Sequence, residues 1–338
     1  MSDRIDYGTA VPLSSGGTAE VYKAYDARLG RAVALKFLRR DDPQQVERLL
    51  REARALAHLP VHENLCTIYG VGTQNGRPYI AMELIEGVSL REARAQLTRS
   101  ERVQVVMQIA SALERVHAAG LVHRDIKPAN IVLARRADGT PRPVLVDFGT
   151  VWLPSEATMT RLGQWLGTPA FMAPEQVIGG HRTLGPATDV YGLGGTLYHL
   201  LIGRPPFDGP ADLTLLQRVI HDPPTPPRAL DATLSPALEA IVLRCLRKEP
   251  AARYADAGAL ADDLQRHLAD EPLARATTQQ RTWDRRLLQR ARRWRTPLRA
   301  AALVALVAVA LLMALGYRDQ QRRTAVQRYD RVAQDLEG

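Results

Sequence analysis

Cysteine is scarce in this chain, which has two among its 338 residues, Cys66 and Cys245. They lie far apart in the sequence and neither has a second cysteine close to it. A disulfide framework and a cysteine-rich zinc site are therefore both excluded. We expect the two thiols to be reduced residues of a hydrophobic core.

An apolar leader is absent from the N-terminus. The first 25 residues contain the charged residues Asp3, Arg4, Asp6 and Glu20 and no apolar run. A cleavable signal peptide needs such a run, so none is predicted. We expect the N-terminal part of the chain to lie in the cytoplasm.

An excess of positive charge is absent from most of the chain. Residues 1–273 carry 31 basic and 31 acidic side chains, whereas residues 274–338 carry 14 and 5, so the net charge of +9 belongs to the tail. A nucleic-acid-binding domain would carry its basic excess on the folded part. We therefore do not expect nucleic acid to be a partner, and DNA binding by the arginine-rich tail is kept as an alternative.

The most informative stretch is 123–130, which reads HRDIKPAN and is followed by DFG at 147–149 after a predicted hairpin. Asp125 can accept a proton from a hydroxyl group, and Lys127 can neutralise a phosphate during its transfer. Asn130 and Asp147 supply the oxygen ligands that hold metal ions between ATP phosphates. This set, in this order, is typical of phosphoryl transfer.

These two motifs resemble the catalytic loop and metal-binding triplet of bacterial eukaryotic-like (Hanks-type) serine/threonine protein kinases. The resemblance covers about residues 7–270 and implies an α+β, two-lobed protein kinase fold. A small antiparallel β-sheet lobe with one main helix is expected over 7–85, and a larger, mainly helical lobe over 86–270. The resemblance also implies ATP and Mg²⁺ as cofactors, with Mn²⁺ as an alternative metal. It implies protein substrates with Ser or Thr hydroxyls, and a homodimer is left open.

The small lobe is predicted from short β-rich runs at 21–25, 32–38, 65–71 and 79–84, interrupted by one helix. That helix has Asp42 as its N-cap and Pro43 at its first position. Lys36 ends an apolar strand, where its buried ammonium group needs an anionic partner. Glu52 flanks the apolar face of the helix. The pair Lys36 and Glu52 resembles the strand-lysine to helix-glutamate ion pair of active kinases.

Residues 13–21, LSSGGTAEV, resemble the loop that covers the ATP phosphates. Gly16 stands at the middle glycine position, but Ser14 and Ala19 stand at the outer two, which reduces the freedom of φ there. Taken alone, the stretch is equally consistent with an ordinary hairpin turn. By the resemblance, the nucleotide contacts come from Leu13, Gly16, Gly17, Val21, Ala34, Lys36, Met82, Glu83, Ile85 and Val132. Among these, backbone groups of Glu83 and Ile85 would bind the adenine edge, and Met82 would close the back of the pocket.

Arg124 precedes the catalytic aspartate and has no carboxylate partner evident in the local sequence. This indicates that an activation-segment phosphate is its partner. Within that segment, 147–175, the resemblance makes Thr158 and Thr160 the autophosphorylation candidates. It also implies that Thr168 contacts the catalytic loop.

Four further side chains have structural roles by the same resemblance. Glu175 and Arg253 would form a buried ion pair that anchors the large lobe. Asp189 would cap a helix and hold the backbone of the catalytic loop. His123 would belong to an apolar spine with Phe148, Leu56 and Ile68, and we assign it no proton-transfer role.

Residues 300–317 carry no charge and are bounded by Arg299 and Arg318. At 1.5 Å per residue, a helix over this stretch is about 27 Å long, enough to cross a hydrocarbon core when the arginines reach the interfaces. The sequence predicts a transmembrane helix, and a buried C-terminal helix is the alternative.

The predicted span is flanked by a basic juxtamembrane linker, 271–299, and a short extracytoplasmic tail, 318–338. Residues 281–299 hold eight arginines and residues 318–338 hold five, which places the kinase domain on the cytoplasmic side of the inner membrane. Trp283, Leu287 and Trp294 recur at helical spacing and predict a helix lying on anionic lipid. A solvated basic linker is the alternative.

Two functions compete on this reading. The first is a membrane-anchored serine/threonine kinase that also phosphorylates its own activation segment, supported by Lys36, Glu52, Asp125, Asn130 and Asp147. The second is a pseudokinase scaffold whose altered glycine loop binds nucleotide weakly. Some membrane kinases of this type carry a sensor domain beyond the span, and 21 residues cannot form one. Sensing then occurs elsewhere, or the chain is a truncation.

Overall fold

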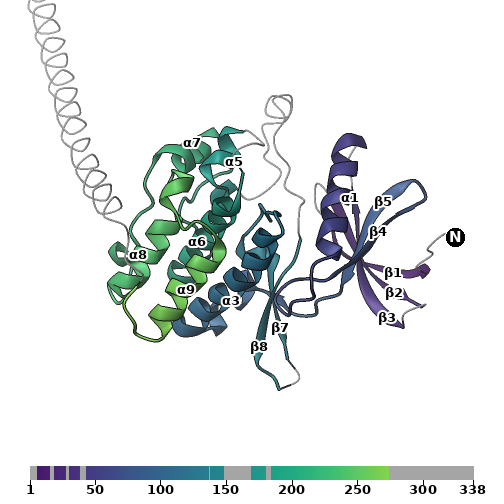
Figure 1. Cartoon of the computed structure of the whole chain (residues 1–338), viewed down its shortest axis with the longest axis horizontal. Coiled ribbons are helices and arrows are strands. Elements are labelled where there is room, and N and C mark those ends of the chain that lie inside the picture. Colours follow the sequence, from purple (N-terminus) through teal and green to yellow (C-terminus); the bar gives the residue numbers. More distant parts are fainter. Residues whose placement is uncertain are drawn as a thin grey trace, which may run out of the picture. The chain divides into compact units, whose positions relative to one another are not determined.

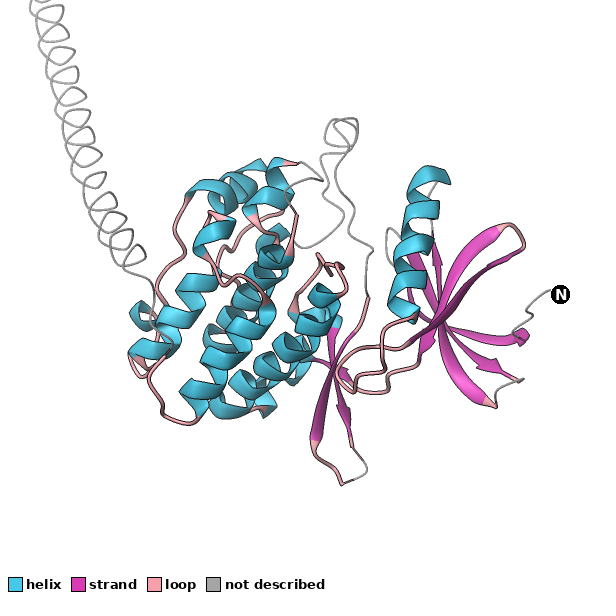
Figure 2. Ribbon diagram, viewed as in Figure 1, coloured by secondary structure: helices cyan, strands magenta, loops and turns pink. Residues whose placement is uncertain are grey.

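The structure, a computed structural model, describes residues 6–15, 19–27, 30–38, 43–136, 138–147, 169–179 and 184–273 of the chain. Internal contacts separate residues 1–274 from residues 275–338, and every element described below belongs to the first group. One part of this unit is a β-sheet, and the other part consists mainly of helices with a separate β-hairpin (Figure 2). An α+β class is thus confirmed for this unit.

The small lobe is a five-stranded antiparallel sheet in the order β1-β2-β3-β5-β4 (Figure 1). Helix α1, Pro43–Ala57, packs against β4 and β5. The strands are β1 Asp6–Ser15, β2 Ala19–Asp26, β3 Arg31–Leu38, β4 Ile68–Gln74 and β5 Arg77–Glu83. In this register Lys36 of β3 lies opposite Val21 of β2 and Ile80 of β5, which places it inside the sheet.

Alternation along the strands builds two hydrophobic clusters, one on each face of the sheet. Ala34, Ile80 and Met82 pack with Ala53 of α1 on one face. Val33, Leu35, Phe37, Tyr79 and Ala81 form the cluster on the other. A shift of one residue in the β3 register would exchange the two sets. The burial pattern therefore fixes which face presents Lys36.

The large lobe is built mainly from helices, with one three-stranded sheet in the order β6-β7-β8. The β7–β8 hairpin projects from the helices in Figure 1. The strands are β6 Val88–Ser89, β7 Ile131–Arg135 and β8 Pro141–Leu145. The helices are α2 Leu90–Ala93, α3 Arg99–Ala118, α5 Pro174–Ile178, α6 Pro186–Ile202, α7 Leu213–His221, α8 Pro236–Cys245 and α9 Ala257–Leu268.

Local sequence signals explain where these helices begin and end. Thr98 caps α3 in a capping box with Glu101, and Pro186 occupies the first turn of α6. Gly203 ends α6 in the left-handed region at φ +92°, where a side chain would be strained. Cys66 and Cys245 are buried free thiols, as predicted.

Most predicted elements are confirmed, including the hairpin before Asp147 and the helix that starts at Pro43. The strand predicted from residue 65 begins three residues later, at Ile68. The preceding backbone bonds to the large lobe instead: Leu145 N donates to Asn64 O, and Cys66 N donates to Leu145 O. Asp42, the predicted N-cap, lies outside the described residues.

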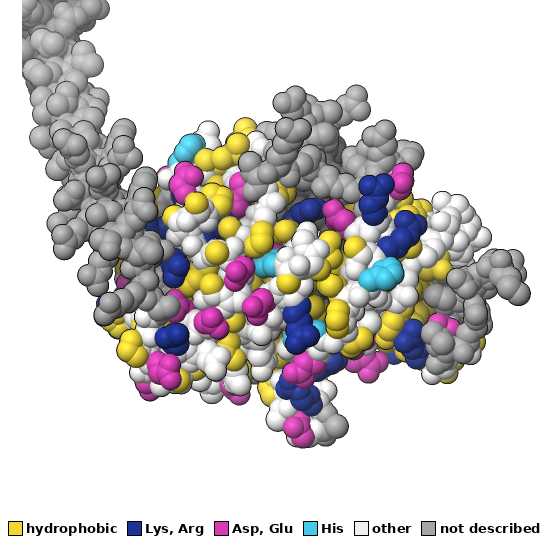
Figure 3. Space-filling model, in the orientation of Figure 1, with side chains coloured by type: hydrophobic (Ala, Val, Ile, Leu, Met, Phe, Trp, Pro, Cys, Tyr) yellow, Lys and Arg dark blue, Asp and Glu magenta, His cyan; other side chains and the backbone are white. Residues whose placement is uncertain are grey.

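Basic and acidic side chains are interspersed on the face of the molecule seen in Figure 3, in keeping with the balanced charge of residues 1–273. Within the described part of the chain, no helix combines the length and hydropathy that a bilayer crossing requires. The predicted membrane helix, 300–317, the linker beyond residue 273 and the tail lie outside the described residues.

Candidate active site

The catalytic loop is held against the first turn of α6. The carboxylate of Asp189 accepts hydrogen bonds from the backbone N–H groups of His123, at 2.8 Å, and Arg124, at 2.7 Å. Asp189 is buried, so these bonds are shielded from water. The predicted role of Asp189 as an anchor of this backbone is confirmed.

Gly192, one turn further along α6, lets the same loop approach the helix closely. A Cβ atom at this position would lie 2.7 Å from Ile126 Cβ and 2.9 Å from Ile126 O, closer than real Cβ contacts. We expect Gly192→Ala to lower the free energy of unfolding by about 1–3 kcal/mol, because the loop or the helix must shift. Thermal unfolding checks this against Gly70→Ala, where the added Cβ meets nothing within 4 Å. Equal melting temperatures would contradict it.

Asp125 lies at the centre of a three-residue cluster. Lys127 Nζ donates to its two carboxylate oxygens at 3.0 and 2.8 Å. Asn130 Nδ2 donates to Asp125 Oδ2 at 2.8 Å and to its backbone O at 2.9 Å. The structure therefore brings together the predicted base, the predicted phosphate-binding cation and one predicted metal ligand.

The second predicted metal ligand, Asp147, follows a strand that bonds to Asn130. Val146 N donates to Asn130 O at 2.9 Å, so the two ligands stand on adjoining backbone. The Asn130 amide nitrogen is used by Asp125, which leaves its oxygen to bind a cation. One carboxylate and one amide oxygen fit Mg²⁺, which takes few protein ligands and fills its shell with phosphate oxygens and water. The described residues contain no cluster of three or more His, Cys, Asp or Glu that could hold a metal alone.

Lys36 reaches Asp147 across the two lobes. Its Nζ lies 2.9 Å from Asp147 Oδ1, and the lysine is 4% exposed. Burial acts against ionisation of Asp147, but the charge and hydrogen bond of Lys36 outweigh it and lower the pKa of this carboxyl group. Asp147 therefore stays ionised, as a metal ligand must be.

Two charge contacts beside the catalytic loop were not predicted from the sequence. Glu52 Oε1 accepts from Arg124 Nη1 at 3.1 Å, and Lys36 pairs with Asp147, so the ion pair between Lys36 and Glu52 stays a prediction. Arg124 has φ +69° and Asp147 has φ +64°. These left-handed conformations are costly for residues with side chains and occur preferentially at functional sites. Arg124, the cation predicted to await a phosphate, therefore has a carboxylate partner on α1.

His123 is buried and serves the loop structurally, as predicted. Its Nδ1 accepts from Asp125 N at 3.2 Å, and its Nε2, 3.1 Å from Val146 O, can donate to it only as N–H. These partners assign a neutral imidazole protonated at Nε2. Burial lowers the pKa of His123, which agrees with the neutral form.

A role for His117 was not predicted from the sequence. Its Nε2 lies 2.9 Å from Asp189 Oδ2, and its side chain is 4% exposed. It therefore supports the same carboxylate that holds the catalytic loop. Its position could have indicated this role: His117 directly follows Val116 on the predicted buried face of α3, where a polar side chain needs a hydrogen-bond partner.

Four of the predicted adenine contacts belong to one hydrophobic cluster. Ala34 and Met82 are buried, and Val21 and Ile85 pack against their cluster. Glu83 N donates to Thr67 O at 2.8 Å, so this N–H is used within the protein. The carbonyl of Glu83 accepts from Cys66 Sγ at 3.5 Å, a weak hydrogen bond that leaves its second lone pair for a ligand, and Ile85 offers its N–H. Val132 lies on β7 opposite Val144, whereas Leu13 is half exposed and belongs to β1.

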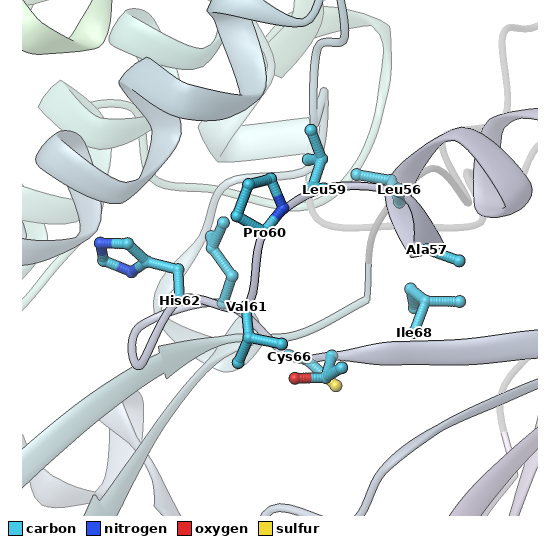
Figure 4. Close-up of a pocket in the computed structure, with 10 residues that line it drawn as sticks. Leu56, Ala57, Leu59, Pro60, Val61, His62, Cys66 and Ile68 are labelled. Carbon is cyan, nitrogen blue, oxygen red and sulfur yellow. The ribbon is translucent and has the colours of Figure 1, made fainter.

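A separate small cavity of about 60 Å³ lies between the end of α1 and the start of β4 (Figure 4). Leu56, Leu59, Cys66 and Ile68 are among its lining residues, and none of the predicted catalytic residues is. Burial raises the pKa of the Cys66 thiol to about 12. The cavity therefore lies beside two predicted spine residues, Leu56 and Ile68, has a mixed polar and apolar lining, and contains an unreactive thiol.

The predicted anchor of the large lobe is present. Arg253 donates to both carboxylate oxygens of Glu175, at 2.7 and 2.8 Å. Gln176, next in sequence, donates from Nε2 to Arg124 O at 2.8 Å and so ties α5 to the catalytic loop. The remaining site predictions lie outside the described residues: Gly16, Gly17, Phe148, Thr158, Thr160 and Thr168.

Comparisons with known proteins agree with this geometry. The serine/threonine-protein kinase PknL of Mycobacterium tuberculosis is 38% identical over 266 residues, which cover 77% of this chain and 65% of the relative. The serine/threonine-protein kinase Pkn1 of Myxococcus xanthus is 39% identical over 266 residues, 76% of this chain and 38% of the relative. The chain thus spans less than two thirds of the length of either relative.

The crystal structure of the Mycobacterium tuberculosis PknI kinase domain is also similar. It matches with a TM-score of 0.60 at 26% identity, covering 78% of this chain and 98% of that one. The family model described as protein kinase domain matches residues 7–267. This match covers more than half of the sequence and includes every residue of the site described above, and the chain therefore belongs to the protein kinase domain family.

Proposed function

We propose that this chain is a serine/threonine protein kinase that transfers the γ-phosphoryl group of ATP to Ser and Thr hydroxyls of proteins and of its own activation segment. The observation that carries the proposal is the cluster at Asp125, where Lys127 and Asn130 both donate to one carboxylate. A carboxylate fixed in this way can orient a hydroxyl and accept its proton, while the ammonium neutralises charge on the phosphate. PknL and Pkn1, which are named serine/threonine-protein kinases, support the assignment.

The other residues have roles that follow from their positions. Asn130 and Asp147 would hold Mg²⁺, which neutralises phosphate charge when it is bound. Lys36 is buried with its ammonium group at Asp147, where it can also bind phosphate oxygens of ATP. Glu83 and Ile85 would bind the adenine edge through the carbonyl and the N–H. Asp189 and Gly192 fix the loop that carries the base.

The test is transfer of label from γ-labelled ATP with Mg²⁺ to a basic protein acceptor and to the chain itself. We expect phosphoserine or phosphothreonine in the wild-type products. Lys36→Met is expected to reduce kcat/KM by about a hundredfold, because the buried cation is lost while the side-chain volume is kept.

Lys23→Met is the matched control for that variant. Lys23 is half exposed and pairs with Glu86 at the surface, so its loss should leave activity within about twofold of the wild type. No labelled acceptor with the wild-type chain would exclude the kinase function. Equal losses in the two lysine variants would exclude a specific role for Lys36.

A pseudokinase scaffold is the second candidate, favoured by Ser14 and Ala19 at two glycine positions of the phosphate-covering loop. Ala19 is a buried β2 residue opposite Leu38. The scaffold hypothesis predicts that ATP with Mg²⁺ leaves the melting temperature unchanged, whereas a kinase should be stabilised by ligand binding.

We propose further that the chain is a single-pass protein of the cytoplasmic membrane with its kinase domain in the cytoplasm. Support comes from the uncharged stretch 300–317 and from the greater number of arginines before it. Fractionation with and without residues 298–317 tests this. Recovery of the undeleted chain in the soluble fraction would overturn the proposal.

A further inference from the structure

Arg142, on β8 of the large lobe, contacts two other segments, one of which ends at Glu83, a predicted adenine contact. Its Nη1 donates to the backbone oxygen of Glu63 at 3.2 Å, and its Nη2 donates to Glu83 Oε1 at 3.4 Å. Glu63 lies between α1 and β4, and Glu83 is the last residue of β5. One guanidinium group therefore joins three segments that are remote from one another in the sequence.

Glu83 is held from both sides of its carboxylate. While Arg142 binds Oε1, the backbone N–H of Thr67 donates to Oε2 at 3.3 Å, and Glu83 N donates to Thr67 O at 2.8 Å. These contacts fix both the side chain and the N–H of Glu83. The carbonyl of Glu83 belongs to the next peptide group, and its direction is set by the extended backbone at the end of β5, where Glu83 pairs with Val33 of β3 and its oxygen accepts from Cys66 Sγ at 3.5 Å. The contacts of the Glu83 side chain and N–H hold the residue in this conformation.

Further contacts hold Arg142 and the segment that contains Glu63 in place. Asn64 Nδ2 donates to Pro143 O at 2.7 Å, and Arg136 Nη2 pairs with Glu63 Oε2 at 2.8 Å. Together with the backbone bonds of Leu145, they tie the β7–β8 hairpin to the segment before β4. The side chains of Arg142 and Glu83 are 25% and 26% exposed, so their pair is partly shielded from water.

We propose that Arg142 is a positioning residue for adenine recognition: through Glu83 it orients the carbonyl that accepts a hydrogen bond from the adenine amino group. The inference rests on the proposed function for the identity of the ligand. It adds that ATP affinity, and selectivity for an amino group at that edge, depend on a side chain of the large-lobe hairpin that contacts no nucleotide.

The test compares Arg142→Met and Glu83→Gln in the full chain. In Glu83→Gln the amide oxygen can still accept from Thr67, but the amide NH₂ group cannot accept from Arg142. Each variant is expected to raise the Kd and KM for ATP about fivefold and to reduce the preference for ATP over GTP. We expect kcat and the KM for the protein acceptor to stay within about twofold. The double variant should bind ATP as well as either single one, because both remove the same contact.

Arg135→Met is the matched control, because Arg135 is exposed on the same hairpin and donates to Gly139 O. It should leave the Kd for ATP unchanged. A lower melting temperature of Arg142→Met without a change in that Kd would overturn the proposal and leave a structural role. If the wild-type chain binds ATP but transfers no phosphate, the proposed function fails, and the effect of Arg142→Met on equilibrium binding still decides the inference.

Discussion

Asp125→Asn is expected to lower kcat by a factor of about 10²–10⁴ while the KM for ATP changes by less than about threefold. The amide has the size of the carboxylate but cannot accept the proton of a hydroxyl. It also leaves Lys127 without the charged acceptor that it meets at 2.8 Å. Because Asp125 binds neither adenine nor the proposed metal, the loss should fall on the chemical step.

The measurement is steady-state transfer of labelled phosphate at saturating ATP. Asp138→Asn is a matched control, since Asp138 is exposed and caps Thr140 in the turn between β7 and β8. That variant should keep the wild-type kcat. More than about a tenth of the wild-type kcat in folded Asp125→Asn would show that another group orients and deprotonates the hydroxyl.

The catalytic loop could be predicted from sequence because its chemistry is local. Asp125, Lys127 and Asn130 lie within six residues, so the turn that joins them also brings their side chains together. Asp189 was predicted through the family resemblance, and the structure confirms its contacts with the loop backbone. In both cases the prediction came from a sequence motif.

The pairing of charges between distant segments could not be predicted in the same way. Arg124 pairs with Glu52 and Asp147 pairs with Lys36, and the backbone of both Arg124 and Asp147 is left-handed. Neither contact follows from residue spacing, because the partners are 72 and 111 residues apart in the sequence. Arg142 likewise joins segments 59 and 79 residues away, and no motif marks that contact.

Arg253→Met is expected to lower the free energy of unfolding by about 3–5 kcal/mol, because it leaves the carboxylate of Glu175 buried without its charged partner, with a hydrogen bond from the Thr188 hydroxyl at 3.0 Å still in place. The guanidinium side chain is 0% exposed and the carboxylate side chain 8%. Arg253 also donates to the backbone oxygens of Arg247, Lys248 and Ala187, so several buried acceptors lose their donor together. Urea unfolding followed by circular dichroism would measure the change.

Two comparison variants separate the ion pair from the loss of side-chain packing. Arg266 is exposed on α9, so Arg266→Met should change stability by less than about 0.5 kcal/mol. Combining Arg253→Met with Glu175→Leu should cost less than the sum of the single changes, because no charge remains buried. A purely additive double variant would contradict the ion-pair explanation.

Since Gln176 beside Glu175 donates to Arg124 O, the Arg253→Met protein that remains folded should also show a lower kcat.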